Sequence, residues 1–154
     1  MTRPIPEGLR SLTPQLSIDG AADAIAFYKK AFGAVEKSRA PDPTGKKIWH
    51  AEIHIGDSAL FVNDTFPEMG GGPSKSCLWL YVDGVDAAFK RALEAGSDVK
   101  VKMPVADMFW GDRMGALTDR WGNDWNLAQR VKDLTPEQMQ KAADEFTAQN
   151  APKK

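Results

Sequence analysis

The chain has 154 residues, the usual length of one compact domain, and it carries 20 lysines and arginines against 21 aspartates and glutamates. A net charge of -1 creates no long-range field, so we expect neither nucleic acid nor a membrane surface as a partner. A single cysteine, Cys77, excludes an intrachain disulfide and favours a reducing compartment. Because no apolar run approaches the ~18 residues that span a bilayer, we expect a cytoplasmic protein.

The first half of the chain predicts a strand, a helix and three further strands. An alternating stretch leads to Gly20, and apolar residues then recur at helical spacing until Gly33, which predicts the end of the helix. Three strand-like runs follow, "VEKSRA", "KIWHAEIHIG" and "SALFVND", with a tight turn at Gly56 between the last two.

The same order returns in the second half. The strand "SCLWLYV" precedes the pair Asp83-Gly84, which lies 64 residues after the pair Asp19-Gly20 of the first half. A helix follows and is expected to end at Gly96. The strands "DVKVKM", "RMGALTD" and "DWNLAQR" follow, with Trp121 in the last turn. The repeat predicts an α+β domain over residues 10–131, built from two βαβββ modules at 10–66 and 75–131. A Gly/Pro-rich linker, expected to be flexible, joins them. Residues 132–154 should form a C-terminal helix, capped by Thr135, and a tail.

Alternation along the strands divides their side chains between a helix-facing side and a side that lines a cleft. The residues expected on the cleft side are Thr13, Gln15, Ser17, His50, Glu52, His54, Cys77, Trp79, Tyr81, Asp124, Asn126 and Ala128. Trp125 should be buried beneath the second helix. Trp79 and Tyr81, with Phe109 and Trp110 above them, suit a flat or partly apolar ligand. A dimer interface is the alternative use of Phe109 and Trp110.

The paired modules, with "AIAFYKKAFGA" in the first helix and "WGDRMGALTDRWGNDW" in the last hairpin, resemble the vicinal oxygen chelate superfamily over residues 10–131. Within it, the chain resembles the PhnB-like branch of glyoxalase/bleomycin resistance proteins. The resemblance implies tandem βαβββ modules that form a curved mixed sheet around a cleft, followed here by the C-terminal helix. Two modules make one cleft, either within a chain or across a homodimer.

The resemblance also implies four metal-ligand positions, which fall near Thr13, at Phe61 or Val62, at Cys77 and at Asn126. None of these is a histidine or a carboxylate, the ligands that metal-dependent relatives use, so we expect no divalent metal and no other cofactor. His50, Glu52 and His54 offer a rival set, but the Cα atoms of His50 and His54 should lie ~13 Å apart along a strand. We expect a polar strand face on which His50 and Glu52 bond to each other or to a ligand.

Three further residues have two interpretations each. His50 is the best candidate for proton transfer, because an imidazole titrates near ~6.5. Cys77 is either a nucleophile or a small buried filler. Arg113, next to Asp112, either presents its guanidinium to an anionic ligand or forms a loop ion pair.

The sequence therefore favours a metal-free protein that binds a small organic molecule in an aromatic cleft, where the ligand would be sequestered as it is by the bleomycin resistance relatives. The expected ligand-binding residues are Gln15, His50, Cys77, Trp79, Tyr81, Phe109, Trp110, Arg113 and Asn126. A lyase, isomerase or dioxygenase is the alternative, with His50 and Glu52 as acid and base or as partial metal ligands. A structural homodimer with a vestigial cleft is a third reading.

Overall fold

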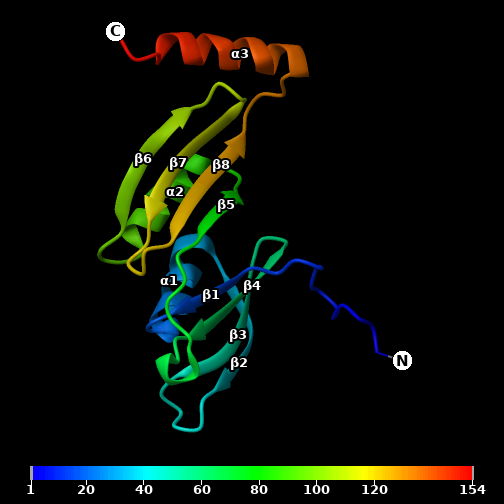
Figure 1. Cartoon of the computed structure of the whole chain (residues 1–154), viewed down its shortest axis with the longest axis vertical. Coiled ribbons are helices and arrows are strands. Elements are labelled where there is room, and N and C mark those ends of the chain that lie inside the picture. Colours follow the sequence, from blue (N-terminus) through cyan, green and yellow to red (C-terminus); the bar gives the residue numbers. More distant parts are fainter. Residues whose placement is uncertain (1, 154) are drawn as a thin grey trace.

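The computed structural model describes residues 2–153 and contains the two predicted βαβββ modules (Figure 1). The first module consists of β1 (Gln15–Ile18), α1 (Ala21–Phe32), β2 (Val35–Pro41), β3 (Ile48–Ile55), β4 (Ser58–Asp64) and a short 3-10 helix, η1 (Pro67–Met69). The second consists of β5 (Cys77–Tyr81), α2 (Val85–Glu94), β6 (Lys100–Asp107), β7 (Asp112–Thr118) and β8 (Asp124–Arg130). The C-terminal helix is α3 (Pro136–Gln149).

Each module forms its own four-stranded mixed sheet, in the order β1-β4-β3-β2 and β5-β8-β7-β6. The first strand of each module pairs parallel with the last, and the other pairs are antiparallel. The linker is tied down rather than free: the Ser74 amide donates to the Ser17 carbonyl, and the Ser76 amide donates to the Asn123 side chain. In the strand order of each sheet, β1 and β5 are edge strands.

The two modules share one hydrophobic core, in which α1 packs against α2. Trp125 is 2% exposed, and its ring centroid lies 4.4 Å from that of Phe32 and 5.1 Å from that of Tyr28. Its burial was predicted correctly, but its aromatic partners belong to the first helix rather than the second. Trp121, expected only in a turn, also packs against α1, with Phe27 and Tyr28.

A buried carboxylate ties the modules together inside this aromatic core. Asp119 is 3% exposed and accepts hydrogen bonds from the Tyr28 hydroxyl at 2.7 Å and the Trp125 indole Nε1 at 3.0 Å. The backbone amides of Trp121 and Asn123 donate to its other oxygen. Burial of Tyr28, reinforced by the charge of Asp119, raises the pKa of this phenol well above its usual range.

Side chains at the end of the last strand of each module cap helices α1 and α2. The Asp64 carboxylate, at the end of β4, accepts from the amides of Gly20 and Ala21 at 3.1 and 3.0 Å. The Gln129 amide oxygen, near the end of β8, accepts from Gly84 and from Val85, both at 3.1 Å. These contacts satisfy donors that a helix N-terminus leaves free, and they connect the helix to the last strand of its own module.

The predicted helix ends hold for the first module and fail for the second. Gly33 adopts the left-handed conformation at φ 69° and ends α1. The second helix ends at Ala95 in a right-handed conformation, so Gly96 is not its stop signal. A Cβ atom at Gly96 would lie 3.0 Å from Cδ2 of Phe27, so this glycine allows the chain to pass close to α1.

The C-terminal helix begins with the predicted capping box, in which the Thr135 hydroxyl accepts from the Gln138 amide and the Gln138 side chain accepts from the Thr135 amide. Within residues 2–153, no helix combines the length and apolar character needed to cross a membrane.

Candidate ligand-binding face

Each sheet has one face against the helices and one face that we call its open face. Ala128, expected on the cleft side, is buried, and Leu78 and Leu80 on the helix side of β5 are only partly buried. For most other strand positions the predicted alternation holds, and the apolar residues on the helix side are almost inaccessible. These residues include Leu16, Ile18, Ala51, Ile53, Ile55, Trp125 and Leu127. On the open face of the second sheet, Trp79 and Tyr81 keep 47% and 56% of their surface exposed. Two large aromatic side chains are thus available to a ligand or a partner.

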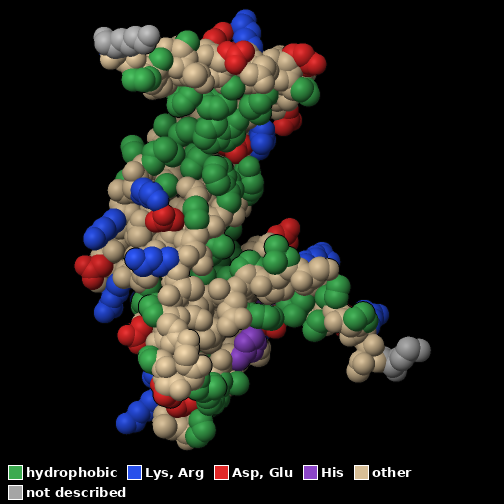
Figure 2. Space-filling view, in the orientation of Figure 1, with side chains coloured by type: hydrophobic (Ala, Val, Ile, Leu, Met, Phe, Trp, Pro, Cys, Tyr) green, Lys and Arg blue, Asp and Glu red, His purple; other side chains and the backbone are tan. Residues whose placement is uncertain are grey.

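Trp79, Tyr81, Phe109 and Trp110 come together as an aromatic patch. The Trp79 ring centroid lies 6.3 Å from that of Tyr81 and 6.4 Å from that of Trp110, and Phe109 meets Trp110 edge to face at 5.0 Å. Figure 2 shows hydrophobic side chains gathered on the second module below α3. The aromatic residues predicted at the cleft therefore form one continuous surface.

Asp112 holds this patch in place from below. It is 1% exposed, and its Oδ2 accepts from the Tyr81 hydroxyl and from the Trp110 indole Nε1, each at 3.0 Å. Its Oδ1 lies 2.9 Å from Nε of Arg130, which neutralises the buried charge. The polar ends of two rings are thereby fixed while their faces remain open. No sequence pattern predicted this role of Asp112, whose expected partner was its neighbour Arg113.

Arg113 does not lie on the ligand side, contrary to its predicted role. Its guanidinium binds Asp86 of α2 at 2.7 Å and Asp107 at 3.0 Å. The hydrogen bonds from Arg113 lower the pKa of Asp86. Since Arg113 pairs across the sheet with Gln129, which caps α2, alternation places it on the helix side. Arg130 is the arginine that reaches the aromatic patch.

The open face of the first sheet is polar. The Gln15 amide donates to Asn63 at 2.7 Å, and Asn63 also bonds with Ser17. Farther along, the Glu52 carboxylate lies 2.6 Å from Nε2 of His54. Of the two predicted alternatives, a bond between His50 and Glu52 is not formed, because His50 packs edge to face against Phe61, at 4.6 Å between ring centroids. A bond from either residue to a ligand stays a prediction. Phe61 stands opposite Glu52 in the register, and its ring occupies the space beside His50.

Cys77 and Asn126 lie side by side on the open face of the second sheet. The Asn126 amide donates to the Cys77 Sγ at 3.3 Å, and the thiol is exposed, which excludes the buried-filler interpretation. Nearby, Lys102 forms an ion pair with Asp124 and lowers the pKa of that carboxyl. Of the predicted ligand residues, the second sheet thus brings together Cys77 and Asn126 with the aromatic patch, whereas Gln15 and His50 lie on the first sheet.

Similarity to known proteins shows the family of this chain. The model of the Glyoxalase/Bleomycin resistance protein/Dioxygenase superfamily matches residues 12–127. The chain belongs to this superfamily. Protein Rv0887c of Mycobacterium tuberculosis is 41% identical over 141 residues, which cover 86% of this chain and 81% of that protein.

Solved structures share the superfamily fold. TioX from Micromonospora sp. ML1 is 24% identical, with a TM-score of 0.66, over 79% of this chain and 99% of that one. PA1353 from Pseudomonas aeruginosa is 26% identical, with a TM-score of 0.63, over 80% of this chain and 99% of that one. Both agree with the arrangement of two βαβββ modules.

The residues present do not fit the superfamily's metal centre. In residues 2–153, no three side chains of His, Cys, Asp or Glu gather closely enough to hold an ion. On the second sheet, the expected positions hold Cys77 and Asn126, which bond to each other. On the first sheet, the expected positions fall near Thr13 and at Phe61 or Val62, and none of these side chains is a histidine or a carboxylate. One thiol and one amide cannot replace a set of histidines and carboxylates.

A small pocket lies where the modules meet near the aromatic patch. Its volume is about 180 Å³, and it is lined by residues such as Pro14 and Ala59 from the first module and Trp79 from the second. Small-molecule sites usually have volumes of ~300–1,000 Å³. This pocket is smaller than that range, and Trp79 and Tyr81 remain about half exposed.

Proposed function

We propose that the open face of the second sheet binds a small, flat organic molecule without a metal ion, against Trp79, Tyr81 and Trp110. The observation that carries this proposal is the buried carboxylate of Asp112, which fixes Tyr81 and Trp110 while the faces of the rings stay accessible. Rigid aromatic side chains bind flat ligands at a low cost in conformational entropy. We place the chain in the PhnB-like branch and propose that it acts in the cytoplasm. There it would bind and sequester its ligand without transforming it.

We further propose that a homodimer completes the site, with the first sheet of the second copy covering the aromatic patch. The patch is too exposed to enclose a ligand alone, and β1 and β5 are both outer strands able to accept a neighbour. The polar first-sheet face, with Gln15 and Asn63, would then supply hydrogen bonds to the rim of the ligand. Sedimentation of the ligand-bound protein checks this assembly.

Replacing Trp79 with alanine is expected to weaken the binding of 2-naphthol, a flat aromatic probe, about fivefold to tenfold, because one stacking surface is lost. Isothermal titration calorimetry measures the affinity. Since Trp79 is about half exposed, the free energy of unfolding should fall by no more than about 1 kcal/mol.

Val101→Ala is the matched control for this experiment. Val101 is 51% exposed, but it pairs with Leu117 on the helix side of the same sheet, so its loss should leave 2-naphthol binding unchanged. Equal effects of the two variants would contradict the proposed site. A loss of several kcal/mol in Trp79→Ala would place that ring in the core instead.

Proton transfer is the second candidate function, and the short contact between His54 and Glu52 favours it. A carboxylate on one ring nitrogen orients the imidazole and leaves Nδ1 to accept a proton from a substrate carbon next to a carbonyl. This pair replaces His50 and Glu52, which the structure does not bring into contact.

In D2O, the protein should catalyse exchange of the α-protons of hydroxyacetone, detected by proton NMR, as His54 removes a proton and returns a deuteron. His54→Gln should abolish the exchange, and His50→Gln should retain it. Absence of exchange in the unaltered protein, or equal loss in both variants, would rule out this use of His54.

A further inference from the structure

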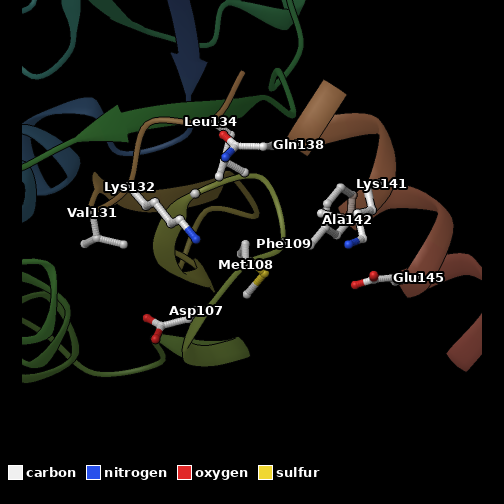
Figure 3. A pocket seen from close by; sticks show the side chains of 11 residues that line it. Asp107, Met108, Phe109, Val131, Lys132, Leu134, Gln138, Lys141, Ala142 and Glu145 are labelled. Atoms are coloured by element: carbon white, nitrogen blue, oxygen red, sulfur yellow. The ribbon is translucent and has the colours of Figure 1, made fainter. Parts of the chain in front are cut away.

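We propose that the cavity between α3 and the β6–β7 loop is a second ligand site, which takes a carboxylate with an aliphatic body. This cavity is about 470 Å³ in volume, within the range typical of small-molecule sites. It is lined by Met108, Phe109, Val131, Leu134 and Ala142, with charged residues at its rim (Figure 3). The site shares only Phe109 with the aromatic patch, so it goes beyond the function proposed above.

Backbone hydrogen bonds fix the wall of this cavity on the sheet side. The amides of Val131 and Lys132 both donate to the Gly111 carbonyl at 3.0 Å, and the Met108 amide donates to the Asp112 carbonyl at 2.7 Å. A Cβ atom at Gly111 would lie 2.2 Å from the Lys132 carbonyl oxygen, so only glycine allows this close approach. The chain thus leaves the sheet at a defined point and enters α3.

The opposite wall of the cavity is helix α3, which buries none of its side chains. A capping box begins α3, yet none of its described residues is buried. Its one aromatic contact joins Phe146 to Phe109, at 4.9 Å between ring centroids. Ala142 of α3 and Leu134, which lies just before the helix cap, both line the cavity. The apolar lining therefore remains available to an aliphatic chain.

The charges at the rim favour an anion. Neither Lys132 nor Lys141 has a carboxylate within ion-pair distance among residues 2–153, whereas the Asp107 carboxylate is bound by Arg113. Glu145 is the other acidic residue of the rim. Figure 3 shows Lys132 reaching toward Met108 and Phe109 from the sheet side, while Lys141 stands on α3. An ammonium group on each wall of an apolar cavity complements a carboxylate with a hydrocarbon tail.

Calorimetric titration of the full chain with decanoate, below its micelle concentration, tests this site. Lys132→Gln and Lys141→Gln should each weaken decanoate binding about fivefold, the scale of one partly exposed ion pair. Decan-1-ol, which lacks the charge, should bind more weakly than decanoate. Lys37→Gln is the control, since Lys37 is exposed on β2, far along the chain from the cavity, and should leave the affinity unchanged.

Two further variants separate this site from the aromatic patch. Ala142→Phe should fill the cavity and prevent decanoate binding while circular dichroism and 2-naphthol binding stay unchanged. Trp79→Ala should weaken 2-naphthol and spare decanoate. Decanoate binding that survives both Ala142→Phe and the double lysine variant, or that is lost with Trp79→Ala, would overturn the proposal, and neither result depends on whether the aromatic patch binds 2-naphthol.

Discussion

Replacing Asp119 with alanine is expected to lower the free energy of unfolding by about 3–5 kcal/mol, because several buried donors lose their acceptor at once. The Tyr28 hydroxyl, the Trp125 indole and two backbone amides all point at this carboxylate. Urea denaturation followed by tryptophan fluorescence measures the change, since Trp121 and Trp125 both lie in the affected core.

Two further variants test whether the unpaired hydrogen-bond donors around Asp119 cause the loss of stability in Asp119→Ala. Tyr28→Phe removes a single hydrogen bond to Asp119 and should cost about 1 kcal/mol. Asp57→Ala removes an exposed carboxylate that bonds only to its neighbour Ser58, so stability should change by less than about 0.5 kcal/mol. If Asp119→Ala cost no more than Tyr28→Phe, the carboxylate would not be the link between the modules.

Trp125→Ala is expected to cost about 3–5 kcal/mol, the range for deleting a large buried aromatic side chain. The ring touches Phe32 and Tyr28 and donates to Asp119, so its loss leaves a cavity and an acceptor with one donor fewer. Because these partners lie on α1, the loss should destabilise both modules together in a single unfolding transition.

Trp49→Ala is the matched variant for this experiment. Trp49 is 40% exposed and stacks on Phe66 at 4.4 Å, outside the core, so its removal should cost about 1 kcal/mol. Similar losses in Trp49→Ala and Trp125→Ala, or separate transitions for the two modules in Trp125→Ala, would contradict the shared core.

Alternation predicted the faces of the sheets well because a strand has a fixed period of two. Leu16 and Trp125 are buried and Trp79 is exposed, as expected. Alternation says nothing about which neighbours bond on one face. Both His50 and His54 flank Glu52 at the same spacing, and the position of Phe61 on the adjacent strand decided between them.

Arg113 shows a different limit of sequence reasoning. Its strand was predicted, and counting alternate residues back from the buried Leu117 would have placed it on the helix side. The expectation of a ligand role instead followed from its neighbours in the loop, Trp110 and Asp112. The same count would have placed Asp112 on the open face, among the aromatic residues. Contacts between modules, such as Asp119 with Tyr28, depend on packing that no local pattern encodes.

The two modules look alike in the sequence repeat, but they contribute different parts to the shared aromatic core. Each βαβββ copy contains a complete set of elements, yet α1 is buried partly by tryptophans of the other copy, and Tyr28 bonds to a carboxylate from that copy. If the repeat arose by duplication, the copies have since become specialised: one contributes the helix that the rings cover, and the other contributes the rings. Neither copy closes a core of its own, so a change in the aromatic residues of one copy also alters the packing of the other.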